Sequence, residues 1–102
     1  MIKFKYTHLD IPGFITPGSK TLIEFTFDGE PDLISAVSPA CGCTADPKVE
    51  GNKVIATFTE QDAKNQNKTH YPEGVYKFTK TINVFLKDKS TVRLTFSGNV
   101  LL

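Results

Sequence analysis

The stretch "TLIEFTF", residues 21–27, alternates polar and apolar side chains, and this alternation decides the fold class. In a β-strand successive side chains point to opposite faces, so Ile23, Phe25 and Phe27 share one face. A strand with one apolar face is typical of a sheet that packs against a core on one side. The same period of two recurs in four other segments, residues 2–6, 53–59, 75–86 and 92–96.

Clusters of proline, glycine and polar residues separate these segments. Such clusters favour turns, because glycine accepts positive φ and proline restricts φ. We expect residues 10–13 (DIPG) to end the first strand. Residues 46–47 and 50–52 are expected to bracket a short connection, and Gly98 to allow a bend or a bulge before the last residues.

Strand-like segments separated by turn signals, at spacings of about 8–12 residues, are typical of all-β folds. No segment has the pattern of a long helix. We therefore expect an immunoglobulin-like antiparallel β-sandwich of about seven strands, formed by residues 1–102 as one domain. A small barrel is the competing architecture.

The charge balance excludes the usual electrostatic argument for some partners. The chain of 102 residues has 12 basic and 11 acidic side chains and a net charge of +1. This balance favours neither a nucleic acid nor an anionic membrane as partner. No apolar run approaches the roughly 20 residues of a membrane span. The first residues, "MIKFKYTH", lack the apolar stretch of a signal peptide, so we expect a cytoplasmic location.

Both cysteines lie in one motif, Cys41-Gly42-Cys43-Thr44. In an extended segment residues i and i+2 point to the same side, so the two thiols could bind a metal, form a strained disulfide, or fill the core. Structural zinc takes four ligands, and the histidines of this chain, His8 and His70, lie in distant segments. We favour two buried thiols with no metal or other cofactor. A metal-binding or thiol-redox protein is the alternative.

The cysteine motif and its flanks resemble a known family. The matching segments are "PGS" (17–19), "DGEPDL" (28–33), "SPACGCT" (38–44), "KTINV" (80–84) and "LTFSGNV" (94–100). With them the chain resembles the bacterial immunoglobulin-like domains of unknown function that carry a Cys-Gly-Cys-Thr motif. These are similar to the major-sperm-protein-like domains of ciliary and centrosomal proteins. The resemblance spans nearly the whole chain and implies an immunoglobulin-like fold; a copy of this size without a leader suits a viral or phage accessory protein.

Two further places are candidates for function. The segment "EQDAKNQNKTHYPEG", residues 60–74, is polar, and loops of that length are usually functional or disordered. We expect His70 and Tyr71 in this loop to contact a partner, with an idle surface insertion as the alternative. His8 continues the alternation of Phe4 and Tyr6 and is expected to be a packed or edge histidine.

The sequence shows neither a nucleophile elbow nor a glycine-rich phosphate loop, so an enzyme is not expected. It predicts a non-catalytic module that binds proteins through its sheet edges and end loops. The expected partner is another protein, a further copy of the chain in a homo-oligomer, or a larger assembly such as a phage particle. The last case would place the chain in the virion.

Overall fold

The computed structural model of the chain describes residues 2–16, 18–39, 44–59 and 74–101. These residues form eight β-strands and one short 3-10 helix. No helix in this part of the chain has the length and apolar character that a membrane span needs. The strands are β1 (Lys3–Phe4), β2 (His8–Ile15), β3 (Lys20–Asp28), β4 (Ile34–Pro39), β5 (Thr44–Glu50), β6 (Lys53–Thr59), β7 (Val75–Leu86) and β8 (Thr91–Leu101), and the 3-10 helix is Pro31–Leu33.

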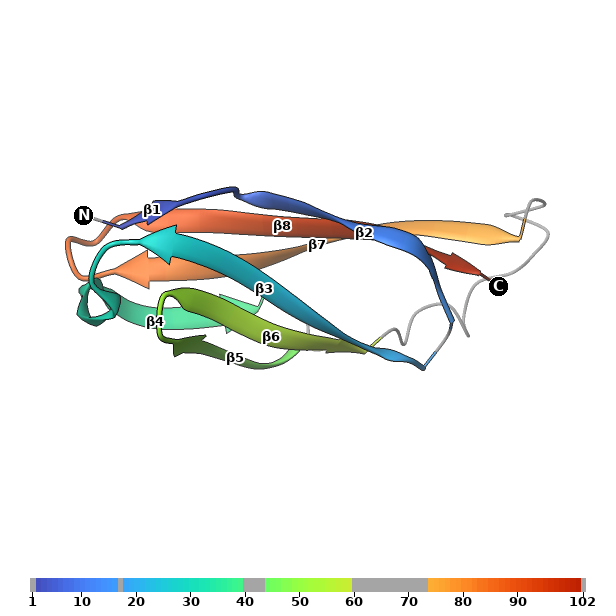
Figure 1. Cartoon of the computed structure of the whole chain (residues 1–102), viewed down its shortest axis with the longest axis horizontal. Helices are drawn as coiled ribbons and strands as arrows, with labels where there is room; N and C mark the ends of the chain where they lie inside the picture. The colour runs from blue at the N-terminus through green and yellow to red at the C-terminus, as the bar shows by residue number, and fades with distance from the viewer. Residues whose placement is uncertain (1, 17, 40–43, 60–73, 102) are drawn as a thin grey trace.

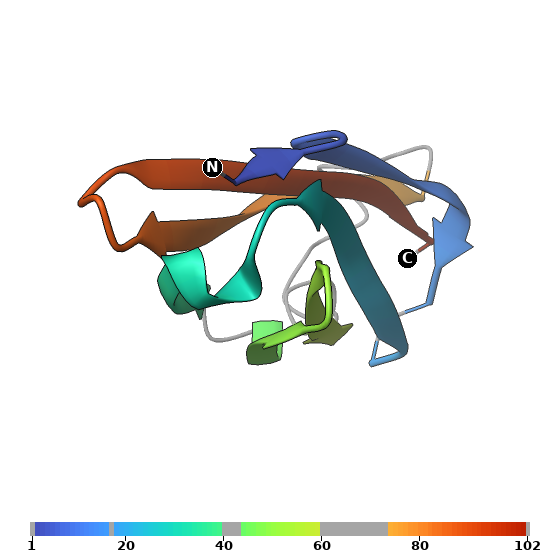
Figure 2. The ribbon, with the colours of Figure 1, turned by 60° about the vertical axis from the view of Figure 1, so that its left-hand side comes forward.

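The strands form two four-stranded sheets, with the orders β1-β3-β6-β5 and β2-β8-β7-β4. Figure 1 and Figure 2 show the sheets as two layers that pack face to face. Each strand pair among the described residues is antiparallel except β2 with β8, which is parallel. The predicted all-β sandwich is confirmed.

The N-terminal segment contributes to both sheets. Its first part, β1, pairs with the end of β3, where Phe4 lies opposite Phe27. The chain then crosses to the other sheet, where β2 runs beside β8. Because β2 and β8 run in the same direction, this pair is the parallel one. The crossing explains why one segment of alternating sequence becomes two strands.

The expectation that residues 10–13 end a strand is wrong, because β2 continues through Pro12 and Gly13. The pairing with β8 shifts register between Asp10 and Phe14, and Gly13 takes a φ of +73°. Such an irregularity is tolerated here because β2 is an edge strand. On its outer side a missing proline N–H breaks no ladder hydrogen bond.

Residues 46–47 also lie within a strand, where a connection was expected. β5 runs from Thr44 to Glu50 and pairs with β6, with a register shift between Ala45 and Lys48. β5 is an edge strand of its sheet. Bulges at sheet edges accommodate a proline, and the turn-forming pair at 46–47 thus bends the strand without ending it.

Gly98 serves packing and does not interrupt β8. The pairing of β8 with β7 is continuous through this residue, and the bulge lies opposite, in β2. A Cβ atom at residue 98 would lie 3.0 Å from Cζ of Phe78 and 3.4 Å from Cβ of Ile11. The missing side chain therefore makes room for the Phe78 ring.

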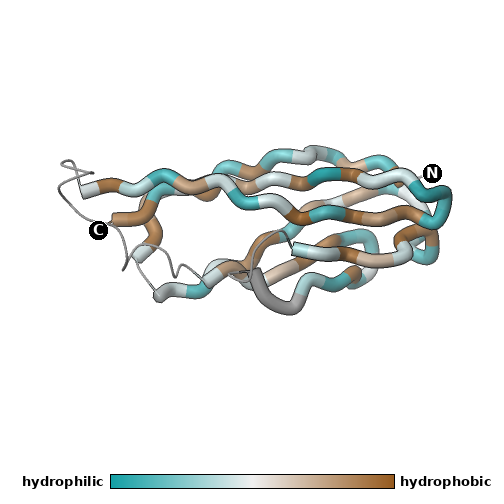
Figure 3. The backbone as a smooth tube through the Cα atoms, turned by 180° about the vertical axis from the view of Figure 1, so that it is seen from behind, coloured by the Kyte–Doolittle hydropathy of each residue, from teal (hydrophilic) through white to brown (hydrophobic). Residues whose placement is uncertain are grey.

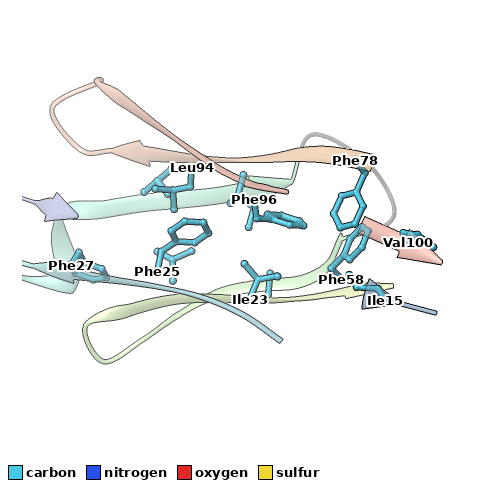
Figure 4. Close-up of a cluster of buried hydrophobic side chains, with 13 residues drawn as sticks. Ile15, Ile23, Phe25, Phe27, Phe58, Phe78, Leu94, Phe96 and Val100 are labelled. Atoms are coloured by element: carbon cyan, nitrogen blue, oxygen red, sulfur yellow. The ribbon is translucent and has the colours of Figure 1, made fainter. Parts of the chain in front are cut away.

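The core lies between the sheets and follows the predicted alternation, which Figure 3 shows as alternating colours along the strands. Phe58 of β6 connects the two layers, since its ring stacks on Phe78 at 4.7 Å and meets Phe96 edge-on at 5.3 Å between centroids. Figure 4 shows these rings between the sheets. The buried apolar residues are Ile15, Ile23, Phe25, Phe27, Val54, Ala56, Phe58, Phe78, Ile82, Val84, Leu94, Phe96 and Val100.

Candidate functional site

Most of the site residues expected from the sequence lie outside the described residues. Cys41, Gly42 and Cys43 are among them, and so are His70 and Tyr71. The backbone of Thr44 begins β5 and lies opposite Phe58 of β6. The metal, redox and core-filling interpretations of the cysteines therefore stay predictions, as does the partner contact in residues 60–74.

A cluster of polar side chains lies where β2 pairs with β8, on the outer face of the sandwich. His8 Nδ1 is 2.6 Å from Thr95 Oγ1, and His8 Nε2 is 2.9 Å from Asp10 Oδ1. The Ser97 hydroxyl donates to the same Asp10 oxygen at 2.8 Å. We call these four residues the His8 cluster. Each strand contributes two members, so the cluster ties β2 to β8.

The His8 cluster combines residue types found in hydrolase triads, but it lies in open solvent. The side chains of His8 and Asp10 are 47% and 83% exposed. The Ser97 oxygen lies closer to Asp10, at 2.8 Å, than to His8 Nε2, at 3.3 Å. An attacking hydroxyl must give its proton to a base, whereas here the hydroxyl donates to the carboxylate. The geometry therefore suits a set of side-chain hydrogen bonds that holds β2 and β8 together.

The hydrogen bonds of the His8 cluster stabilise the charged form of Asp10. The bond from Ser97 is the main cause that lowers the pKa of Asp10 below its ordinary value of 3.8, and the bond with His8 is the second. The carboxylate is thus ionised at neutral pH and accepts both bonds.

The sequence placed His8 on the face of Phe4 and Tyr6, and this part of the prediction is wrong. Phe4 packs against the core, whereas His8 is exposed on an edge strand and faces outward. The cause is the crossing between sheets, because alternation keeps its phase only within one strand. The sequence did contain a pattern that indicates an outer polar face. Thr95 and Ser97 alternate with buried residues, and His8 and Asp10 alternate with less exposed ones.

An open depression of about 360 Å³ adjoins the His8 cluster at the bulge of β2. Asp10, Lys77, Thr79, Ser97 and Asn99 contribute to its lining. These side chains are exposed or half-buried. Binding pockets bury most of the surface of their ligand, and an open depression lined by exposed polar groups cannot do so. This depression therefore offers surface contacts and is not a binding pocket.

A different feature distinguishes β3. One side of this strand pairs with β6 over residues 20–26, whereas among the described residues the other side is paired only at its end. There β1 pairs with Phe27 and Asp28, and the Lys5 N–H donates to the Thr26 carbonyl at 3.0 Å. Over residues 20–24, no strand of the described chain pairs with this side. We call it the β3 edge; in Figure 1 this half of β3 runs away from β1.

The direction of the backbone groups along β3 follows from one hydrogen bond. The Phe27 N–H donates toward the β6 side, to the Asn52 carbonyl, at 2.9 Å. Because N–H and C=O groups alternate in direction, odd-numbered residues of β3 bond to β6 and even-numbered residues face the β3 edge. Lys20, Leu22 and Glu24 thus present their backbone donors and acceptors there.

The side chains beside the β3 edge combine one apolar group with two opposite charges. Leu22 is 60% exposed, more than any other leucine among the described residues. Glu24 Oε2 lies 3.7 Å from Lys53 Nζ, and Lys20 is exposed. The Tyr6 hydroxyl donates to the Glu24 carbonyl at 3.0 Å. An approaching strand would meet this mixed surface.

A scan of protein-family models finds no match to this chain, and a search of curated proteins finds none either. The candidate site is thus defined by the geometry of this chain alone. Of the two surfaces, the His8 cluster is internally satisfied, whereas the β3 edge carries backbone groups directed outward.

Proposed function

We propose that the chain is a non-catalytic, immunoglobulin-like module that binds a protein partner by strand addition at the β3 edge. The observation that carries the proposal is the outward row of backbone groups at Lys20, Leu22 and Glu24. Such a row is a template for another extended segment, which gains main-chain hydrogen bonds there. The exposed Leu22 side chain adds apolar area beside it.

The strand order supports the immunoglobulin-like part of the proposal. Immunoglobulin domains place their first, second, fifth and fourth strands in one sheet and their third, sixth and seventh in the other. If β1 and β2 are taken as one divided first strand, β1-β3-β6-β5 and β2-β8-β7-β4 follow this order. Domains of this architecture host many functions, so the function rests on the β3 edge and not on the fold.

The geometry of the His8 cluster supports a role without catalysis. Its hydroxyl, imidazole and carboxylate groups bond to one another across β2 and β8 and lie in open solvent. Water at such a site weakens the electrostatic stabilisation on which enzymes depend. A module of this kind would serve within a larger assembly, of which a phage particle is one example.

Site-specific photo-crosslinking tests the proposed function. A benzoylphenylalanine replaces Leu22 in the full chain, which is then irradiated in the cells that naturally contain it. We expect a crosslink to protein, either to another protein or to a second copy of the chain.

The matched control is the same photoreactive residue at Lys48, an exposed position on β5 at the far edge of the same sheet. We expect little crosslinking from this position. Equal yields from both positions, or none from residue 22, would contradict the proposal.

A further inference from the structure

We infer that the partner strand at the β3 edge is the β3 edge of a second copy of this chain, paired antiparallel about a two-fold axis at Leu22. This inference rests on the proposed function and names its partner. In such a pair Leu22 lies opposite Leu22 of the second copy. Since Leu22 directs its N–H and C=O outward, the two residues would exchange both hydrogen bonds.

The charges beside the β3 edge complement themselves under this symmetry. A two-fold axis at Leu22 places Lys20 of one copy opposite Glu24 of the other, and the reverse pair forms as well. Opposite charges at directly facing positions stabilise antiparallel strands, and like charges destabilise them. The segment "KTLIE", residues 20–24, is therefore complementary in charge to its own reverse.

The uncovered part of β3 has the length and position that this pairing needs. Toward the C-terminal end of β3, the uncovered part stops where the Lys5 N–H donates to the Thr26 carbonyl. At the N-terminal end of β3, a turn precedes Lys20. The Ser19 N–H closes this turn by donating to the Thr16 carbonyl at 3.1 Å, and Gly18 has a φ of +82°. Within the part of the chain that the structure describes, the unpaired window thus spans residues 20–24, and its centre is Leu22. A window centred on the symmetry axis maps onto itself, as an isologous contact requires.

The existing contacts of Glu24 are compatible with the pair. Its carbonyl oxygen accepts one bond from the Tyr6 hydroxyl, and a carbonyl has a second lone pair for the N–H of the second copy's Lys20. Its carboxylate, 3.7 Å from Lys53 Nζ, is about half exposed and has a second oxygen available for another ammonium group.

The pair would join two sheets into one, in the order β5-β6-β3-β3-β6-β5. Because the pairing window is short, the contact area stays below that of a stable interface. We therefore expect a concentration-dependent dimer with a Kd on the order of 100 µM.

Sedimentation equilibrium of the full chain, with charge-reversed variants, tests the inference. K20E brings two carboxylates to each facing pair and E24K brings two ammonium groups, so each variant alone should associate about tenfold more weakly than the natural chain. An equimolar mixture of the two should recover association, because in the mixed dimer each facing pair joins a carboxylate of the K20E chain to an ammonium group of the E24K chain. The double variant K20E/E24K should recover the natural affinity in full, since both of its facing pairs are again of opposite charge.

Lys48 and Glu50 on β5 provide matched controls, since they form a similar exposed pair at 3.6 Å. K48E and E50K should leave the association unchanged. A natural chain that stays monomeric up to millimolar concentration would overturn the inference, as would a double variant K20E/E24K that associates no better than either single variant. If residue 22 nevertheless crosslinks to a different protein, the proposed function survives and only the identity of the partner is wrong.

Discussion

The outer sides of β8 and β3 differ, although the same N-terminal segment runs past both. β2 covers β8 and is tied to it by the His8 cluster, whereas β1 covers only Phe27 and Asp28 of β3. Both strands nevertheless bury their inner faces equally well. The alternation of a strand thus determines its buried face, while the path of a neighbouring segment determines whether its side is covered.

The largest expected effect is a loss of stability that should be equal for β3 and β8. Phe25 of β3 and Phe96 of β8 are both fully buried. We expect Phe25→Ala and Phe96→Ala each to lower the free energy of unfolding by about 3–5 kcal/mol, because each leaves a cavity. Urea denaturation measures both, with Phe14→Ala, at a residue that is 63% exposed, as the control. A small loss at either buried position would show that the inner faces are not equivalent.

Gly98→Ala should disturb the inner face of β8, next to the bulge of β2. The new methyl group would lie 3.0 Å from Cζ of Phe78, so the ring must move. We expect a loss of about 1–3 kcal/mol in the free energy of unfolding. The double variant Gly98→Ala with Phe78→Leu should show a loss smaller than the sum of the single ones, since the shorter side chain leaves room. Strict additivity in this cycle would argue against the contact.

Proline substitutions at two neighbouring positions should distinguish the side of β3 that pairs with β6 from the side that forms the β3 edge. Thr21 lies opposite Phe58 and, by the alternation, directs its N–H to β6. Thr21→Pro should therefore cost about 1–3 kcal/mol of unfolding free energy, because a carbonyl of β6 loses its donor. Leu22→Pro removes an N–H that faces the β3 edge and should cost less, while abolishing any association there. Equal losses in thermal or urea denaturation would contradict the assigned directions.

The smallest effect concerns the side-chain hydrogen bonds between β2 and β8. The pKa of Asp10 is lowered first by the Ser97 hydrogen bond and then by His8, so the ionised form stabilises the folded chain. This stabilisation is complete above the ordinary pKa of 3.8 and is lost as the pH falls through the lower pKa of the folded state. We expect Ser97→Ala to raise the pKa of Asp10 toward 3.8 in a carboxyl NMR titration.

A matched control for this titration is Asp88, whose pKa is lowered by Ser90 in the turn after β7. Ser90→Ala should raise the pKa of Asp88 and leave that of Asp10 unchanged. If Ser97→Ala leaves the pKa of Asp10 unchanged as well as that of Asp88, the hydrogen bond from Ser97 does not stabilise the Asp10 carboxylate in solution.

Much of the fold could be predicted from the sequence because burial repeats locally. The alternation at Ile23, Phe25 and Phe27 is visible within seven residues, and the structure confirms it. The strands at residues 8–15 and 44–50 were missed because Pro12 and Pro47 usually mark turns. A proline on an edge strand is tolerated, but which strands lie at an edge depends on the pairing of distant segments.

The candidate site was less accessible to sequence reasoning for the same reason. The His8 cluster joins His8 to Thr95, residues from opposite ends of the chain. The β3 edge depends on where β1 leaves one sheet for the other, and no local pattern marks that crossing. The charges at Lys20 and Glu24 were visible, but their meaning follows only from the uncovered strand between them.

The placement of Tyr6 gives the chain an optical reporter of its own. Its ring packs on Phe25 at 5.6 Å between centroids, and its hydroxyl binds the Glu24 carbonyl beside the β3 edge. The chain has three tyrosines and no tryptophan, so phenol emission is not masked by indole. A strand that adds its own N–H to the Glu24 carbonyl would change the surroundings of the Tyr6 hydroxyl and with them its emission. Occupancy of the β3 edge would then be readable by fluorescence without a label.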